Sequence, residues 1–307
     1  MGIDRPDDDD APTVEPDSPA TRGNTLAVDR DPPDVDFPDS PADREAEHIR
    51  YRAVVECDAA REDWVAALPE FQAAWDDHLR RYPHPERSER TVRPDGSWHG
   101  DGVLELTPKQ NVEVDGRYEQ ICDTGKGVIL PIMTRLEAEA PERHLAGLEN
   151  FLKMSDRLKE KVAGDIEYKG RSAEQSLDNI KDSVRFTFVY AEERYTEGVH
   201  ADCARLESAG FEPFDRQNSW LGHQYKGINS RWQEPESGLL FEVQFHTQAS
   251  MGAKELTHQA YERLRGSVAL DDERTELEAF QTTVSAKIPI PPGASEIKDY
   301  SSRKRDG

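Results

Sequence analysis

The segment 241–247, FEVQFHT, alternates apolar with polar side chains, and the polar ones are a carboxylate, an amide and an imidazole. This alternation predicts a strand with one face in the core, so that Glu242, Gln244 and His246 share the other face. A second carboxylate, Asp182, opens the apolar run DSVRFTFVY, which also predicts a strand. Two carboxylates on neighbouring strands suit magnesium, which takes one or two protein carboxylates together with substrate phosphates. The residues alone leave a simpler interpretation open, in which Asp182 caps a turn and Glu242 faces water.

A basic cluster precedes the first of these strands and could bind a triphosphate. It consists of Lys153, Arg157, Lys159 and Lys161. Arg157 and Lys161 are four residues apart and share one face of an expected helix, whereas Lys159 lies off that face and is expected to be a solvated bystander. In isolation, such a cluster is more often only a solvated helix surface.

The loop GHQYKGIN places Tyr225 and Lys226 beside a flexible residue, Gly227. A loop tyrosine can stack on a nucleotide base, although more often it simply packs on the core. Two histidines, His246 and His258, could suggest zinc. The sequence does not support a zinc site, because no further cysteine or histidine stands near them at metal spacing.

Strands alternating with helices must position these side chains. Strands are expected at 147–153, 182–190, 210–220, 225–233 and 238–247, and helices at 155–166, 192–209, 248–265 and 271–287. Ser155 is the expected N-cap of the first helix. Pro235 and Gly238 predict a hairpin between the last two strands. The expected fold is α+β, a mixed β-sheet flanked by helices.

Composition divides the rest of the chain. Residues 1–41 are rich in Asp, Pro and Ser with little to bury, which predicts a disordered acidic segment. Residues 42–145 predict a mainly helical extension, in which Pro69 separates two helices and 82–101 is a loop. Residues 146–290 form the main domain, and a C-terminal tail follows over 291–307.

The charge balance limits the classes of partner. The chain carries 62 acidic and 39 basic side chains, a formal net charge of −23. Because nucleic-acid binding needs a cationic surface, this balance excludes DNA and disfavours tRNA. The three cysteines, Cys57, Cys122 and Cys203, lack metal spacing and indicate reduced thiols. With no membrane-spanning run and no signal-peptide core, the expected location is cytoplasmic, without membrane contact.

The order of these motifs resembles the synthetase domain of the RelA/SpoT family, the pyrophosphokinases that make (p)ppGpp and related nucleotides. The resemblance covers roughly 147–266 and is strongest to small stand-alone or toxin-type synthetases. The family's E-x-Q-x-[RH]-T strand is matched by Glu242, Gln244, His246 and Thr247. It implies a nucleotidyltransferase-like fold, with magnesium as cofactor, ATP as pyrophosphate donor, a purine nucleotide as acceptor and AMP as leaving group.

The resemblance also implies residue roles. Asp182 would hold the metal, and Glu242 would be its second ligand or the base that accepts the hydroxyl proton. Lys153 and Lys161 match the donor-binding segment, and Arg157 would join them on the triphosphate. Acceptor binding is assigned to Tyr225, which would stack on the base, and to Lys226, Asn229, Gln244, His246 and His258.

The chain departs from the family pattern at several of these places. The departures are Phe151 and Arg157 in the donor segment, Arg185 and Thr187 after the metal Asp, and Asn229 at the end of the acceptor loop. Arg185 stands where the family has a small residue, and Thr187 where it frequently has Arg. No histidine–aspartate hydrolase signature is found over 42–146, which predicts synthesis without a second, degrading activity.

Three functions compete at this stage. The chain could be a synthetase that acts on free GDP, GTP, ADP or ATP. It could be a toxin of the same fold that pyrophosphorylates the 3′ end of tRNA, with an antitoxin or immunity protein as partner. It could also be a non-catalytic nucleotide-sensing module. Net acidity counts against tRNA, and the intact acid pair counts against the non-catalytic module.

Overall fold

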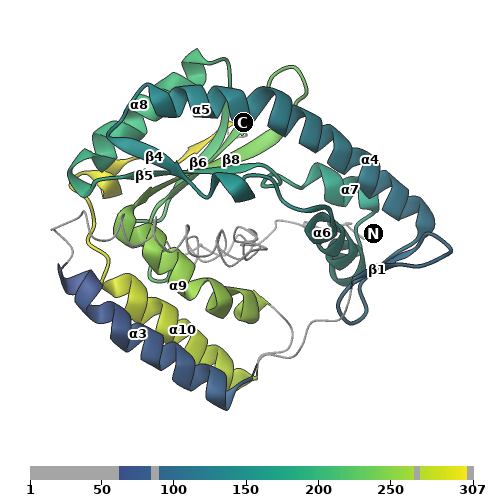
Figure 1. The fold of residues 1–307 in the computed structure, drawn as a ribbon, viewed down its shortest axis with the longest axis horizontal. Helices are drawn as coiled ribbons and strands as arrows, with labels where there is room; N and C mark the ends of the chain where they lie inside the picture. The colour runs from purple at the N-terminus through teal and green to yellow at the C-terminus, as the bar shows by residue number, and fades with distance from the viewer. Residues whose placement is uncertain (1–61, 84–89, 266–269, 303–307) are drawn as a thin grey trace, which may run out of the picture.

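A computed structural model of the 307-residue chain describes residues 62–83, 90–265 and 270–302 (Figure 1). The disorder predicted for 1–41 and the start of the predicted helical extension lie outside the described residues, as does Cys57. Among the helices that are described, none has the length and apolar character needed to cross a membrane.

A six-stranded mixed sheet in the order β4-β5-β8-β7-β6-β9 forms the centre of the fold (Figure 1). Strands β5 (Arg185–Tyr190) and β8 (Leu240–Thr247) lie side by side in parallel, and the other neighbouring pairs are antiparallel. The remaining strands are β4 (Arg143–Ala146), β6 (Glu212–Asn218), β7 (Ile228–Gln233) and β9 (Tyr300–Ser301). The predicted α+β class is confirmed, and β7 and β8 form the predicted hairpin.

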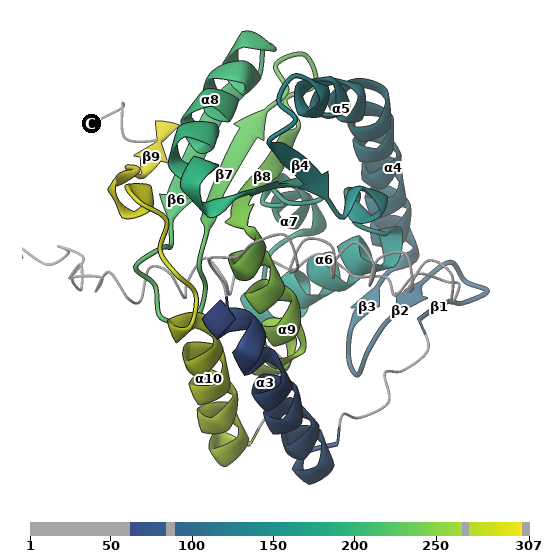
Figure 2. The same ribbon diagram turned by 60° about the vertical axis from the view of Figure 1, so that its left-hand side comes forward.

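Helices cover both faces of this sheet (Figures 1 and 2). Helix α8 (Tyr195–Ser208) packs on the apolar face of β8, where the Tyr195 hydroxyl donates to the carbonyl oxygen of Phe245 at 2.9 Å. Helix α9 (Gln248–Arg265) follows β8 directly and lies over the opposite, polar face. The other helices that flank the sheet and the site are α4 (Pro108–Thr124), α5 (Leu130–Ala138), α6 (Ser155–Lys169) and α7 (Ala173–Asp178).

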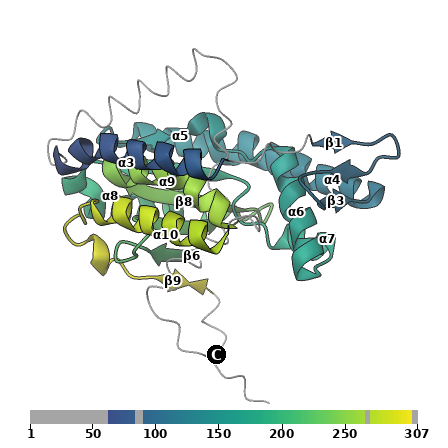
Figure 3. The same cartoon turned by 90° about the horizontal axis from the view of Figure 1, so that it is seen from below.

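Two helices that are far apart in the sequence pack together beside α9. Helix α3 (Glu62–Arg81) lies along α10 (Asp271–Ala286), and both lie beside α9 (Figure 3). The rings of Trp75 and Phe280 stack with their centroids 5.5 Å apart. The helical extension therefore supports the helix that carries part of the site.

The predicted break at Pro69 is wrong, because α3 continues through this residue. A proline in a helix removes the hydrogen bond to the carbonyl four residues earlier, here that of Val65. Both Pro69 and Val65 are exposed, so water can bind this carbonyl and the helix persists.

The loop predicted over 82–101 is in part a small antiparallel sheet. Its strands are β1 (Thr91–Val92), β2 (Trp98–His99) and β3 (Glu105–Leu106). The anchor is Trp98, whose fully buried ring donates through Nε1 to Asp156 Oδ1 of α6 at 3.0 Å. This sheet therefore packs against α6, the helix that carries the basic cluster.

The strand predicted over 147–153 is also wrong. Strand β4 ends at Ala146, a 3₁₀ turn follows over Leu148–Asn150, and Leu152 makes an isolated bridge to Val184. The positive φ of 65° at Gly147 ends the extended conformation at this point. The bridge at Leu152 still sets the next residue, Lys153, at the start of β5.

The predicted N-cap of α6 is displaced by one residue. Met154 is the N-cap, and Ser155 is the first helical residue. The Ser155 hydroxyl donates to Asp115 Oδ1 of α4 at 3.2 Å instead of capping its own helix. Contact with α4 therefore determines where α6 begins.

The segment predicted as a C-terminal tail is partly built into the sheet. Strand β9 pairs with the edge strand β6, and the Asn218 side-chain amide donates to the carbonyl oxygen of Ile297 at 2.8 Å. A strand of only two residues, such as β9, has too little alternation to be predicted from the sequence.

Candidate active site

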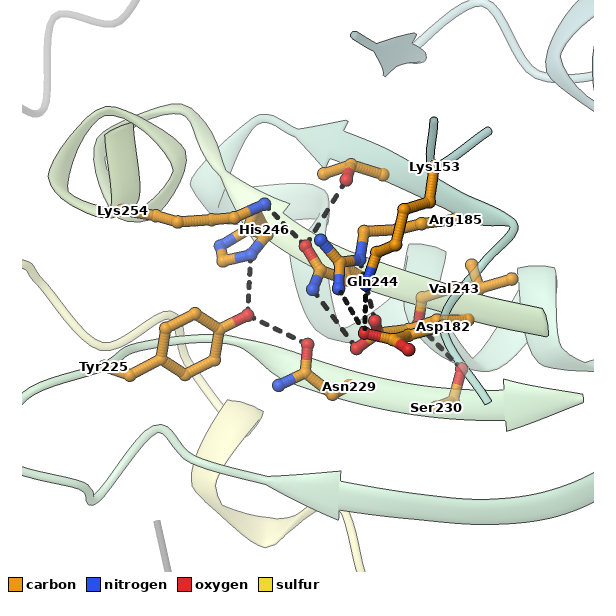
Figure 4. A network of polar contacts seen from close by, with 12 residues as sticks. Lys153, Asp182, Arg185, Tyr225, Asn229, Ser230, Val243, Gln244, His246 and Lys254 are labelled. Carbon is orange, nitrogen blue, oxygen red and sulfur yellow. Dashed lines mark hydrogen bonds and ion pairs between the residues drawn. The ribbon is translucent and has the colours of Figure 1, made fainter. Parts of the chain in front are cut away.

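The polar side chains of FEVQFHT are buried and do not face water. Gln244 and His246 lie beside Lys254 of α9 (Figure 4). Glu242 and His246 have no exposed surface, and Gln244 is almost as deeply buried. Burial of this kind is unfavourable unless each polar atom has a partner, so the contacts of these three residues define the site.

The first group of contacts is a charged cluster, made of Lys153, Lys161, Asp182, Arg185 and Glu242. The two lysines contact different Asp182 oxygens, with Nζ of Lys161 3.0 Å from Oδ1 and Nζ of Lys153 3.2 Å from Oδ2. The Arg185 guanidinium lies 3.4 Å from Asp182 Oδ2 and 2.7 Å from Glu242 Oε2. The two predicted carboxylates therefore meet at one arginine.

The topology explains how these residues meet. Arg185 and Glu242 are directly paired in the parallel β5–β8 ladder, so their side chains leave the same face of the sheet. Asp182 precedes β5, and the backbone N–H of Lys153 donates to the carbonyl oxygen of Ser183 at 2.8 Å. This hydrogen bond holds the segment before α6 against the segment before β5.

The cations keep Asp182 ionised. Burial alone would raise the pKa of Asp182, but the charges of Lys153, Lys161 and Arg185 together hold that pKa well below its usual value. The local positive charge predicted for a triphosphate site is therefore present, although the whole chain is strongly acidic.

Arg157 and Lys159, which also belong to the basic cluster, contact partners other than Asp182. The Arg157 guanidinium reaches from α6 towards α9, where Nη2 lies 3.8 Å from Glu262 Oε1. Lys159 is buried, and its Nζ lies 2.8 Å from Asp115 Oδ1 of α4. The expectation that Lys159 is a solvated bystander is wrong, because α4 covers the side of α6 that carries it.

The second group of contacts is a tyrosine–histidine cluster, made of Tyr225, Asn229, His246 and Ser250. The Tyr225 hydroxyl donates to Asn229 Oδ1 at 2.9 Å and lies 2.8 Å from His246 Nε2. The other ring nitrogen of His246, Nδ1, lies 2.9 Å from Ser250 Oγ. Both ring nitrogens therefore have a polar partner.

The imidazole of His246 is held neutral. Burial, with a further contribution from the charge of Lys254, lowers the pKa of His246 well below its usual value. Gly227 sits against this ring with a φ of 146°, and a β-carbon there would lie 2.8 Å from His246 Cε1. A glycine is therefore required where the loop that carries Tyr225 enters β7.

Lys226 stabilises the loop that was predicted to bind the acceptor. Its Nζ donates to the carbonyl oxygens of Trp220, at 2.9 Å, and of Gly222, at 2.7 Å. Burial lowers the pKa of Lys226. An acceptor contact by this lysine remains a prediction.

Gln244 lies between the two clusters. Its Nε2 donates to Glu242 Oε1 at 3.2 Å, and its Oε1 accepts from Lys254 Nζ at 2.6 Å (Figure 4). Burial, with a smaller effect of the Arg185 charge, lowers the pKa of Lys254 to about 7. The predicted His258 lies one turn further along α9, its Nε2 3.7 Å from Glu262 Oε1.

The sequence analysis did not identify three residues of the site, namely Ser250, Lys254 and Arg185. Ser250 and Lys254 could have been found, because they recur at intervals of four with the predicted His258 and therefore share one face of α9. In the sequence, Arg185 is visible only as a departure from the family pattern. Its contact with Glu242 depends on a strand pairing that the sequence does not specify.

The carboxylates fit magnesium by their chemistry. Asp182 and Glu242 converge on one guanidinium, and their hard oxygen atoms are the ligands that this ion prefers. The described residues hold no group of three or more His, Cys, Asp or Glu side chains able to bind a metal. A magnesium ion at this place would complete its coordination with water and substrate oxygens.

Comparison with known proteins gives similarity only to solved structures. No family model and no curated protein matches the chain. It is similar to the small alarmone synthetase 1 from Bacillus subtilis bound to pppGpp, with 18% identity over 62% of this chain and 96% of that chain and a TM-score of 0.42. It is also similar to the complex of the Type VI effector Tas1 and its immunity protein, with 18% identity, coverage of 63% and 100%, and a TM-score of 0.39.

A GTP pyrophosphokinase family protein from Streptococcus pneumoniae is a further similar structure. It shares 11% identity over 59% of this chain and 90% of that chain, with a TM-score of 0.38. Likeness at this level assigns no function by itself, so the function must be inferred from the side chains of the site.

Proposed function

We propose that the protein is an ATP-dependent 3′-pyrophosphokinase of purine nucleotides. It transfers pyrophosphate from ATP to a ribose 3′-hydroxyl, as in (p)ppGpp or (p)ppApp synthesis, and releases AMP. The observation that supports this proposal best is the charged cluster, in which two buried carboxylates and three cations converge inside an otherwise acidic chain. Transfer of pyrophosphate to a hydroxyl depends mainly on positioning and on neutralising the charge of the phosphate oxygens. The cations of this cluster would neutralise that charge.

The cations of the charged cluster would bind the donor. Lys153 and Lys161 now contact Asp182, and phosphate oxygens of ATP can replace that carboxylate as their partner. Arg157, which reaches from α6 towards α9, would join them on the triphosphate. Magnesium, held by Asp182 and Glu242, would add positive charge to the phosphate oxygens.

The reaction needs one bond made and one broken. The 3′-oxygen of the acceptor bonds to the β-phosphorus, and the bond from that phosphorus to the oxygen bridging the α- and β-phosphates breaks. AMP leaves with the electron pair, and the hydroxyl proton passes to a base. Glu242 would be that base or would orient the hydroxyl, although both its oxygens already accept hydrogen bonds, from Gln244 and Arg185.

The tyrosine–histidine cluster would bind the acceptor. Tyr225 is only half-buried, so its ring can receive a purine while its hydroxyl stays fixed by Asn229 and His246. A neutral, fully buried His246 would act by orienting Tyr225, not by carrying charge to a phosphate. The net charge of −23 favours a free nucleotide over tRNA as the acceptor.

One experiment tests the proposal directly. Purified protein with magnesium and labelled ATP would be offered GDP, GTP, ADP, ATP and bulk tRNA separately, and the products resolved by chromatography. We expect label in a 3′-pyrophosphorylated free nucleotide, with an equal amount of AMP. Transfer to tRNA alone would establish the toxin function, for which an immunity or antitoxin partner is proposed. Absence of transfer to every acceptor would favour the non-catalytic module.

A further inference from the structure

Arg185 occupies the position between the two candidate metal ligands. Its guanidinium contacts both Asp182 and Glu242, and its side chain is only 6% exposed. A guanidinium cannot lose its proton in a protein, so this positive charge is permanent. The β5–β8 register holds Arg185 directly beside Glu242, so the contact belongs to the fold and does not depend on a flexible surface chain.

The charge of this cluster disfavours a free metal ion. Three cations, Lys153, Lys161 and Arg185, contact the two carboxylates. Each oxygen of Asp182 already contacts a cation. A divalent ion that arrived alone would have to displace these cations and then share a largely buried space with them.

We propose that Arg185 keeps the candidate metal site closed until a triphosphate binds. This inference rests on the proposed function, because it concerns the donor half of the same site. In the nucleotide-free protein Arg185 bridges Asp182 and Glu242. When the triphosphate enters, Arg185 and the two lysines turn to its oxygens, and the carboxylates become available to the metal that accompanies the nucleotide.

The charges of the incoming groups favour this exchange. A triphosphate brings about four negative charges at neutral pH. It can therefore partner the three cations of the cluster and also offset the charge of one divalent ion. Arginine suits this exchange because its planar, forked donors bind phosphate and carboxylate equally well. The order of events follows from the charges: nucleotide and metal bind together, and the metal alone binds poorly.

The test measures metal binding and needs no turnover. Mn²⁺ would be titrated into the nucleotide-free full chain, and binding followed by loss of the free-ion signal in electron paramagnetic resonance. We expect the wild type to half-saturate only at about 1 mM or above. Arg185→Met should bind Mn²⁺ at least about tenfold more tightly, because it leaves two buried carboxylates without their shared cation. In the double variant R185M/E242Q this gain should be lost.

Arg231→Met is the matched control. Arg231 is paired with Glu242 on the other side, in β7, but its guanidinium contacts Asp215, with Nε 2.6 Å from Oδ1. This variant should keep the wild-type affinity for Mn²⁺. Tight binding by the nucleotide-free wild type, or no gain in a folded Arg185→Met, would overturn the proposal.

A second measurement on the wild type covers the case in which Arg185→Met does not fold. The Nε–H of Arg185, which donates to Glu242 at 2.7 Å, can be followed by nuclear magnetic resonance and assigned through its loss in Arg185→Lys. Magnesium alone should leave its signal in place, whereas magnesium with a non-hydrolysable ATP analogue should shift it. A shift caused by magnesium alone would refute the proposal that Arg185 keeps the metal site closed. A protein that fails to transfer pyrophosphate could still pass both tests, so failure of the proposed function is distinguishable.

Discussion

The charged cluster and the tyrosine–histidine cluster lie on the same face of β8 but are stabilised by different forces. The charged cluster is held by ion pairs among residues from β5, β8, α6 and the loops before them. The tyrosine–histidine cluster is held by hydrogen bonds between neutral groups. Ion pairs tolerate a change of partner of the same charge, whereas a directed hydrogen-bond chain does not.

This difference suggests a division of labour along one strand. Under the proposed function, the charged cluster would exchange partners when a triphosphate enters. The tyrosine–histidine cluster would present one fixed surface to a base. Gln244 is the connection, since it contacts Glu242 on one side and Lys254 on the other.

The largest expected effect is that of Glu242→Gln. Removing the charge while keeping the shape should lower kcat by about a thousandfold or more, because the metal ligand and the candidate base are lost together. Radiolabelled ATP assays at saturating acceptor would measure the effect, with circular dichroism to confirm folding. Asp215→Asn, at a carboxylate outside the cluster, should keep kcat near wild type. Comparable turnover in a folded Glu242→Gln would disprove the catalytic role.

Two lysines two residues apart on α6 distinguish donor binding from packing. Lys161→Ala should weaken binding of a non-hydrolysable ATP analogue by more than tenfold, since a charge-assisted contact contributes about 1.5–3 kcal/mol. Lys159→Ala should keep the wild-type affinity but lower the Tm by about 2–4 °C, through loss of its contact with Asp115. Calorimetry and thermal unfolding would measure both. Equal affinities in the two variants would show that α6 carries no triphosphate clamp.

Substitutions at Tyr225 separate the ring from its hydroxyl. Tyr225→Ala should raise the acceptor KM, and not the ATP KM, by an amount equivalent to about 1–3 kcal/mol of stacking. Tyr225→Phe keeps the ring and loses the bonds to Asn229 and His246, so its increase should be smaller. Initial rates over acceptor concentration would distinguish the two. An unchanged acceptor KM in Tyr225→Ala would mean that this ring serves only packing.

The smallest expected effect concerns Lys254 and pH. With a folded-state pKa of about 7, against 10.5 in the unfolded chain, Lys254 holds fewer protons when folded than when unfolded between these values. Stability therefore rises with pH across this window, and burial of the charge is most unfavourable below pH 7. Lys254→Met should raise the Tm more at pH 6 than at pH 9, whereas the exposed control Lys109→Met should show no such difference. A gain independent of pH would contradict the lowered pKa.

The sequence predicted the parts of the site that lie on strongly periodic elements. The alternation in FEVQFHT placed Glu242, Gln244 and His246 on one face, and the β-branched and aromatic run after Asp182 predicted β5. The small sheet around Trp98 was not predicted, because strands of two residues show no period. The role of Arg185 could not be predicted, since it depends on which strands are neighbours.

The parallel pairing of β5 with β8 has a consequence for how the protein comes to be active. Arg185 and Glu242 are 57 residues apart in the chain, and their contact closes a long loop that local folding cannot form first. Until these strands join, Glu242 and Asp182 are separate acids on separate segments. In a partly folded chain, whether newly made or passing through a narrow channel, every site residue would be present, but these residues would not yet lie together. Under the proposed function, activity would appear only when this long-range strand pairing has formed.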